Sequence, residues 1–193
     1  MSLPARIETA RLVLRCHRPA DAPLLKAAID SSLEHLRQWM PWAMDEPSTI
    51  EALEERMTKF AANFAAGEDW GYLIFDPHES QVLGGVGVHR RGEPDVLEIG
   101  YWLRVDQQGQ GYVTEAVAAL TDLSLGVEGV SRLEIRCDPR NLRSWAIPVR
   151  LGYQYVGTLQ ANTVTPTGAP RDTMVWELRR SAAQGATPLV ESR

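Results

Sequence analysis

The first residues of the chain alternate between apolar and polar types, which is typical of a half-buried strand. This alternation is clearest over residues 11–16, RLVLRC. Residues 19–40 then change to apolar positions spaced three and four apart, which is the spacing of a helix. Ser31 and Glu34 have the spacing of a capping box, so we expect a second, short helix to begin there.

The longest amphipathic pattern covers residues 48–67 and predicts a helix. Ser48 and Glu51 have the spacing of a capping box at its start, and Gly67 stands where glycine commonly ends a helix. The apolar runs that follow predict three strands, at residues 70–76, 81–91 and 96–103.

The second half of the chain alternates between helices and strands. It predicts a helix over residues 112–125, a strand over 132–137, a short helix over 141–152 and two closing strands over 153–160 and 172–179. Because a helix joins the strands at 96–103 and 132–137, these two strands should be parallel and connected by a right-handed crossover. The order of elements predicts a mixed α/β (α+β) fold.

The composition is that of an ordinary globular protein. The chain has 193 residues, of which 44% are hydrophobic and 23% charged, and no linker or repeat divides it. We therefore expect one domain over residues 1–180. Residues 181–193 are small and polar, and we expect them to form a flexible tail.

Several classes of partner and compartment are not expected. No apolar run approaches the roughly 20 residues that span a bilayer, and the N-terminus lacks the basic start and apolar core of an export signal. We therefore expect a cytoplasmic protein with reduced thiols at Cys16 and Cys137. The formal net charge of −5 argues against nucleic acid as a partner, and the four histidines lack metal-ligand spacing, so we expect no metal.

Residues 97–119, LEIGYWLRVDQQGQGYVTEAVAA, place Gly109 and Gly111 between a strand and a helix. A Walker loop would need lysine after the last glycine, where this chain has Tyr112, and a dinucleotide fingerprint would need glycine in place of Thr114. The glycines still allow the main chain to approach an anion, and the helix start directs unpaired N–H groups and its positive dipole end toward it. An anion site and a plain tight turn both remain open interpretations.

Three segments, EIGYWL, QGQGYVTEA and RCDPRNLRSWAIPVRLGY, together resemble the GNAT family of acyl-CoA-dependent N-acyltransferases. The closest resemblance is to the RimJ/RimL branch, which acetylates protein N-termini and small amines, and it covers nearly the whole chain. It implies a mostly antiparallel sheet with a splayed parallel strand pair and helices on both faces. The family loop, Gln/Arg-x-x-Gly-x-Gly/Ala, aligns with Gln108, Gly111 and Val113, and Val113 departs from the last position.

The resemblance implies that the anion is the pyrophosphate of coenzyme A. The main-chain N–H groups that would hold it belong to Gly109, Gln110, Gly111, Tyr112, Val113 and Thr114. The pantetheine arm would bind like an added strand to the backbone of Tyr101, Trp102 and Leu103. Asn141 matches a family position that contacts the cofactor, and an ordinary helix N-cap is the alternative interpretation.

Transfer from a thioester to an amine needs a neutral amine, a stabilised oxyanion and a proton for the leaving thiolate. The family position of a tyrosine acid is occupied here by Pro148, which has no proton to donate. The RimL-like alternative is Ser144, which could also be a plain polar residue of a helix. Glu98 matches the RimL-like position of a base, and a glutamate on a solvated strand face is the alternative.

By resemblance, Trp39 and Trp42 help to form the wall of the acceptor pocket; a packing corner between helices is the alternative. The implied function is direct transfer of acetyl from acetyl-CoA to a primary amine, on a peptide N-terminus or a small molecule. Two alternatives stay open: a catalytically weak module that binds CoA, and an enzyme using a larger donor such as succinyl-CoA. The resemblance also makes a homodimer plausible. The sequence does not specify the acceptor amine.

Overall fold

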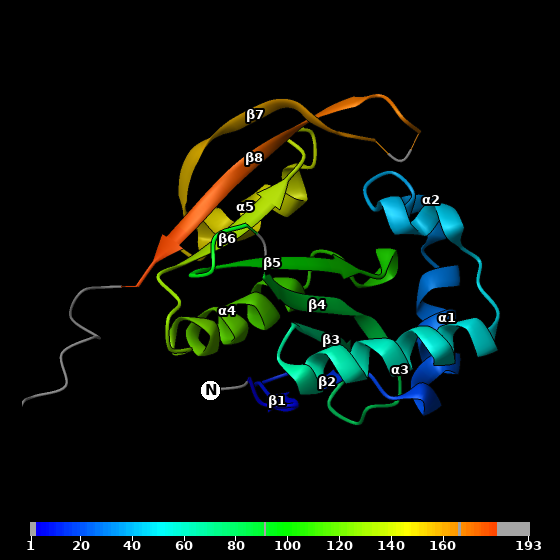
Figure 1. Ribbon diagram of the computed structural model, residues 1–193. Helices are drawn as coiled ribbons and strands as arrows, with labels where there is room; N and C mark the ends of the chain where they lie inside the picture. The colour runs from blue at the N-terminus through cyan, green and yellow to red at the C-terminus, as the bar shows by residue number, and fades with distance from the viewer. Residues whose placement is uncertain (1–2, 91, 166, 181–193) are drawn as a thin grey trace, which may run out of the picture.

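The computed structural model describes residues 3–90, 92–165 and 167–180, so the tail expected at 181–193 lies outside the described residues. In the described part, strands form one sheet in the order β1-β2-β3-β4-β5-β6-β8-β7 (Figure 1). The strands are β1 (Arg6–Glu8), β2 (Val13–Cys16), β3 (Asp69–Phe75), β4 (Val82–Arg90), β5 (Val96–Leu103), β6 (Arg132–Cys137), β7 (Gln154–Val164) and β8 (Pro170–Arg179). Neighbouring strands are antiparallel except β5 and β6, which are parallel as predicted.

Helices cover both faces of the sheet, which confirms the expected fold class (Figure 1). The helices are α1 (Ala22–Asp30), α2 (Leu33–Leu36), α3 (Ile50–Ala66), α4 (Tyr112–Leu125) and α5 (Leu142–Arg150), with 3-10 turns η1 (Pro19–Asp21), η2 (Pro41–Asp45) and η3 (Val105–Gln107). One hydrophobic cluster joins the sheet to α1, α2 and α3, and the other joins it mainly to α4 and α5.

The start of α3 differs from the predicted capping box. The N-cap residue is Thr49, whose hydroxyl accepts from the N–H of Ala52 at 3.2 Å. Ser48 instead donates its N–H to the Glu46 carboxylate at 2.6 Å, so the prediction of Ser48 as the cap was wrong by one residue. Gly67 ends the helix with a φ of +71°, as its position predicts.

The capping box predicted at Ser31 and Glu34 is also wrong. The residue before α2 is Ser32, and no side chain caps this four-residue helix. The Ser32 hydroxyl accepts from the N–H of Val105 at 3.0 Å, and the Ser31 hydroxyl donates to the carbonyl of Ala28 at 3.0 Å. These serines therefore close α1 and anchor the segment after β5, because tertiary contacts prevailed over the local motif.

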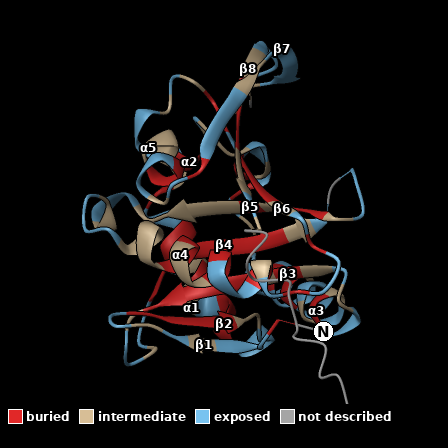
Figure 2. Ribbon diagram, turned by 90° about the vertical axis from the view of Figure 1, so that its left-hand side faces the viewer, coloured by how far each residue is buried: buried red, intermediate tan, exposed pale blue. Residues whose placement is uncertain are grey.

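The central strands are buried on both faces, as Figure 2 shows for β3 and β4. The side chains of Trp70, Tyr72 and Phe75 on β3 are among the largest fully buried ones. Burying each such side chain contributes about 1.5–3 kcal/mol to folding. Within the described ranges, none of the helices is long and apolar enough to cross a membrane.

Candidate functional site

The parallel strands β5 and β6 separate soon after they begin. They pair only from Val96 opposite Arg132 to Glu98 opposite Glu134. Beyond that point β5 remains paired with β4, and β6 with β8. The second half of β5 therefore presents a main-chain edge with no strand partner on its β6 side among the described strands. This opening is the splayed pair that the family resemblance implies.

A glycine-rich loop follows this opening and leads into α4. Gly109 and Gly111 have φ values of +78° and +82°, in the left-handed region that residues with side chains rarely adopt. Gly111 is the N-cap residue of α4, and no side chain caps this helix start. The N–H groups of the first turn thus lack intrahelical partners and lie at the positive end of the helix dipole. This arrangement suits an anion.

Arg11 holds this loop from the turn between β1 and β2. Its guanidinium donates to the carbonyl of Gln110 at 2.9 Å and to the Glu115 carboxylate at 2.7 Å. It also lies 4.9 Å from the centroid of the Tyr112 ring. Glu115 accepts the main-chain N–H of Arg11 as well, at 2.8 Å. Charge-assisted bonds therefore fix the loop and place a cation beside it.

A cavity of about 750 Å³, which we call the loop-side cavity, extends along this loop and the second half of β5. Its lining includes most of the predicted cofactor residues: Tyr101, Trp102, Leu103, Gly109, Gly111, Tyr112, Val113, Thr114 and Asn141. Gln110 is not part of the lining, and its carbonyl accepts from Arg11. Arg11, Arg143 and Arg150 add positive charge to the lining.

Asn141 begins α5 as its N-cap. The side-chain oxygen of Asn141 accepts from the N–H of Ser144 at 3.1 Å. This bond uses only one end of the amide group, and Asn141 lines the loop-side cavity. The helix-capping role and a contact with a ligand are therefore compatible.

Pro148 explains an unusual contact between α5 and β5. Because proline has no N–H, the carbonyl of Ser144, four residues earlier, lacks its usual helical donor. The Tyr101 hydroxyl donates to this carbonyl at 2.9 Å, and the Ser144 hydroxyl donates to the Tyr101 oxygen at 3.3 Å. Burial raises the pKa of Tyr101, so its hydroxyl stays protonated. The sequence analysis named Tyr101 for its backbone alone, and the structure places its hydroxyl beside Ser144.

A polar chain connects α5 to α2 at the loop-side cavity. Arg143 donates to the side-chain oxygen of Gln108, and the Gln108 side-chain nitrogen lies 2.7 Å from Nε2 of His35. Burial, and then the charge of Arg143, lower the pKa of His35. The imidazole therefore stays neutral and can accept from Gln108. Sequence reasoning assigned no role to His35 or Arg143, because no local pattern connects them.

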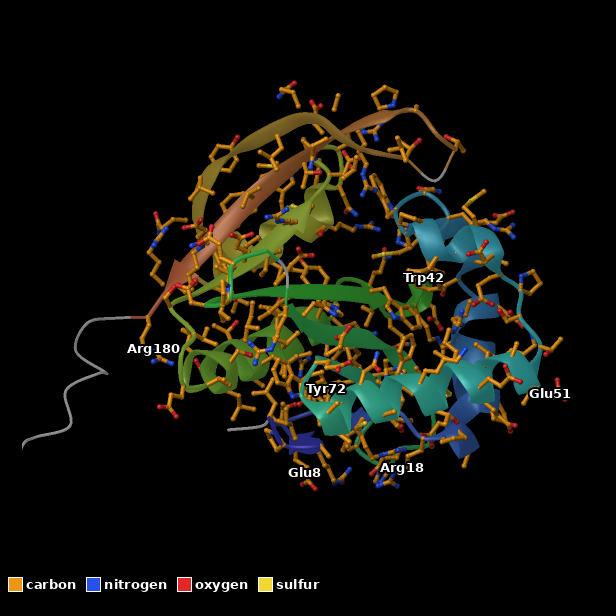
Figure 3. The ribbon with its side chains drawn as sticks, viewed as in Figure 1. Glu8, Arg18, Trp42, Glu51, Tyr72 and Arg180 are labelled. Carbon is orange, nitrogen blue, oxygen red and sulfur yellow. The ribbon has the colours of Figure 1, made fainter. Side chains whose placement is uncertain are left out.

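A second cavity, of about 420 Å³, lies against the sheet face that α1 and α3 cover, and we call it the sheet-face cavity. Trp42, which Figure 3 labels, lines this cavity together with Trp102. The two rings are in edge contact, with their centroids 5.8 Å apart. Trp39 lines the loop-side cavity instead, so the two tryptophans of the predicted acceptor wall border different cavities. Met40, Tyr101 and Trp102 line both cavities, which therefore adjoin at this point.

Glu98 lines the sheet-face cavity from β5. Its side chain is 16% exposed, and Oε2 lies 3.6 Å from Nε of Arg136 on β6. This ion pair offsets part of the cost of burying a carboxylate. On the other neighbouring strand, His89 stands opposite Glu98.

The arrangement suits the transfer of a group between two molecules. A long, phosphate-bearing molecule can lie in the loop-side cavity with one end at the junction of Tyr101 and Trp102. A smaller molecule in the sheet-face cavity can reach the same junction from the other side.

Known proteins are similar to this chain in sequence. The family model described as acetyltransferase (GNAT) domain matches residues 11–154. The probable N-acetyltransferase YjcK of Bacillus subtilis (strain 168) is 28% identical over 120 residues, which cover 61% of this chain and 66% of that protein. The ribosomal protein uS5-alanine N-acetyltransferase of Escherichia coli (strain K12) is 25% identical over 154 residues, 79% of each chain.

Solved structures show the same fold. The microcin C7 self-immunity acetyltransferase MccE, crystallised with acetyl-CoA and AMP, superposes with a TM-score of 0.83 at 21% identity. The superposition covers 92% of this chain and 97% of that one.

Proposed function

Because the chain belongs to the GNAT acetyltransferase family, in the branch of the ribosomal-protein acetyltransferases, we propose that it transfers acetyl from acetyl-CoA directly to a primary amine. The observation that carries the proposal is the junction of two cavities at Tyr101 and Trp102, where β5 has left β6. One cavity leads to an anion-binding loop, and the other is lined by a carboxylate, Glu98.

The loop-side cavity fits a CoA thioester. The main-chain N–H groups between Gly109 and Thr114 would hold the pyrophosphate, with Arg11 as a nearby cation. Both glycines have a left-handed backbone that a side chain would strain, although a Cβ would meet open space at Gly109 and only an ordinary contact, 3.5 Å from the Arg11 guanidinium, at Gly111. The free edge of β5 from Tyr101 to Leu103 would receive the pantetheine amides, and Asn141 would contact the same arm.

Two side chains are proposed to move protons during transfer. Glu98 takes a proton from the attacking nitrogen, because it is a carboxylate on β5, the strand that also carries Tyr101 and Trp102, and it lines the acceptor cavity. Ser144 lines the loop-side cavity and donates to the leaving thiolate once its hydroxyl turns away from the Tyr101 oxygen, to which it donates at 3.3 Å. Pro148 stands where many family members have a tyrosine acid, so the tyrosine hydroxyl near this site comes from β5 instead.

The proposed acceptor is the N-terminal amine of a peptide. Two relatives are named for acetylating ribosomal proteins, one at alanine and one at serine. The sheet-face cavity offers Trp42 and Trp102 to the apolar part of the first residue and Glu98 to its ammonium group. At about 420 Å³ the cavity is at the small end of ligand sites, so it suits one or two residues of a chain whose remainder lies outside.

The proposal is tested by CoA release from acetyl-CoA and succinyl-CoA over a panel of peptides starting with alanine or serine and of small amines. Acetyl-CoA with a peptide should give the fastest release. Faster release with succinyl-CoA would identify the larger donor, and CoA binding without release from any amine would identify a binding module.

Gly111→Asp tests the loop, because its carboxylate would occupy the anion position. We expect it to remove the rise in melting temperature that CoA produces in the wild type. Gly129→Asp is the matched control, since Gly129 has an equally left-handed φ of +81° and no atoms within 4 Å of an added Cβ. Equal CoA binding by the two variants would show that the loop is only a turn.

A further inference from the structure

The proposed reaction, on which this inference rests, must remove two protons from the acceptor nitrogen. A peptide amine has a pKa of about 8 and therefore enters mainly as an ammonium at neutral pH. One proton must leave before attack, and a second leaves after the C–N bond forms. The departing thiolate takes up one proton, so one proton is released to water in each turnover. Glu98 accounts for one of the two transfers.

The floor of the sheet-face cavity is built from glycine. Gly71, Gly87 and Gly100 stand opposite one another on β3, β4 and β5, on the face that lines the cavity. A Cβ at Gly87 would lie 2.9 Å from Nε2 of His89, and a Cβ at Gly71 would lie 3.0 Å from Cε1 of His17. Both imidazoles therefore lie directly on bare backbone, and larger residues in this row would displace them.

His89 lies beside a carboxylate on the neighbouring strand. Its Nδ1 lies 2.6 Å from Oδ1 of Asp69. Two lone pairs would repel at this distance, so the neutral ring carries its proton on Nδ1 and has a lone pair on Nε2. The side chains of His89 and Asp69 are 27% and 42% exposed, so a proton on the ring can be exchanged with water.

The position of Nε2 suits the acceptor nitrogen. His89 stands opposite Glu98, but its ring lies over the next cross-strand pair, Gly87 and Gly100, in the direction of Tyr101 and Trp102. A Cβ at Gly100 would be 3.6 Å from Nε2. The lone pair therefore lies on the cavity floor next to the junction at which the two cavities adjoin.

We infer that His89, oriented by Asp69, takes the first proton from the acceptor ammonium and releases it to water. The N–H bond of the ammonium breaks and an Nε2–H bond forms, leaving a neutral amine and an imidazolium next to the Asp69 carboxylate. The amine then forms the C–N bond, Glu98 takes the second proton, and the C–S bond breaks as Ser144 protonates the thiolate. The proton on Glu98 then replaces, through water, the one that Ser144 gave up. The imidazolium returns its proton to water.

The charged and titratable groups around His89 come from several elements: Asp69 on β3, Glu98 on β5, Arg136 beside Glu98 on β6, His17 directly after β2, Arg56 on α3 and Arg90 on β4. Arg56 is paired with Glu46 at 2.6 Å, and Arg90 lies over the Trp70 ring. Burial lowers the pKa of His17 to about 4, so that ring stays neutral and does not serve as the proton acceptor.

The test compares the pH dependence of kcat/KM for an alanine-initiated peptide in His89→Gln, Glu98→Gln and the wild type. His89→Gln should lower kcat/KM about 10²- to 10⁴-fold near pH 6.5. The loss should become smaller above the pKa of the peptide amine, because most of the acceptor is then already neutral and needs no first deprotonation. Glu98→Gln should show a loss that persists at high pH, because the second proton must still leave. His78→Gln, in an exposed turn, is the matched control and should behave as the wild type.

The outcomes separate the two proposals. A wild-type enzyme inactive on every amine would overturn the proposed function, whereas wild-type turnover with an unchanged pH profile in His89→Gln would overturn only the role of His89. The role of His89 can also be tested without turnover. The 15N NMR spectrum of histidine-labelled protein should contain the signal of a neutral ring with its proton on Nδ1, and this signal should be absent in His89→Gln and shifted in Asp69→Asn. A neutral Nε2–H tautomer at His89 would contradict the inference.

Discussion

Replacing Tyr101 with phenylalanine removes the hydroxyl that bonds to the Ser144 carbonyl at 2.9 Å. The carbonyl is then left without a donor in a partly buried place, because Pro148 supplies no N–H. A lost neutral hydrogen bond of this kind, with one partner left unsatisfied, costs about 1–3 kcal/mol. Since the contact is only partly buried, we expect Tyr101→Phe to lower the free energy of unfolding by about 1–2 kcal/mol.

The proline makes this explanation testable. Pro148→Ala restores an N–H that can donate to the Ser144 carbonyl within the helix, so Tyr101→Phe should cost less in that background. The coupling energy, measured by urea unfolding of the wild type, both single variants and the double variant, should be about 1 kcal/mol. The direct effect of Pro148→Ala on packing cancels in this cycle.

Tyr72→Phe is the matched control. The Tyr72 hydroxyl also donates to a carbonyl, that of Pro4, at 2.8 Å, but no proline-interrupted helix is involved. Its cost should be the same with and without Pro148→Ala. If the cost of Tyr101→Phe is equally unaffected by Pro148→Ala, the link between the proline and the tyrosine is wrong.

Two further predictions concern pH and the loop. Because burial lowers the pKa of His17 to about 4, below its unfolded value of about 6.5, the unfolded state binds its proton first, and stability should fall as pH decreases from 6.5 to 4. His17→Gln should flatten that slope in unfolding measured against pH. Glu115→Gln should loosen Arg11 and so weaken CoA binding several-fold in calorimetry. Glu8→Gln, which breaks an exposed ion pair, should leave CoA binding unchanged. Equal CoA affinities of the two variants would show that the Arg11–Glu115 pair does not support the loop.

Local patterns in the sequence determined the framework of the site. Alternation and helical spacing predicted β5, α4 and β6, and hence the parallel pair and its crossover. Gly109 and Gly111 indicated the loop, because glycine has no Cβ and adopts a left-handed backbone whatever its surroundings. The helix cap at Asn141, the alternative interpretation of that residue, can be recognised from the sequence for a similar reason, since its bond joins it to Ser144 only three residues away.

Only the tertiary structure decided which polar groups work together. Arg11 meets Glu115 across 104 residues, and Tyr101 meets Ser144 across 43. His89 finds Asp69 because β3 and β4 pair in one particular register, over glycines that only the folded sheet brings into a row. Hydrogen bonds and ion pairs act over about 3 Å, so such partners are chosen by strand register and helix packing, which residue spacing along the chain does not record.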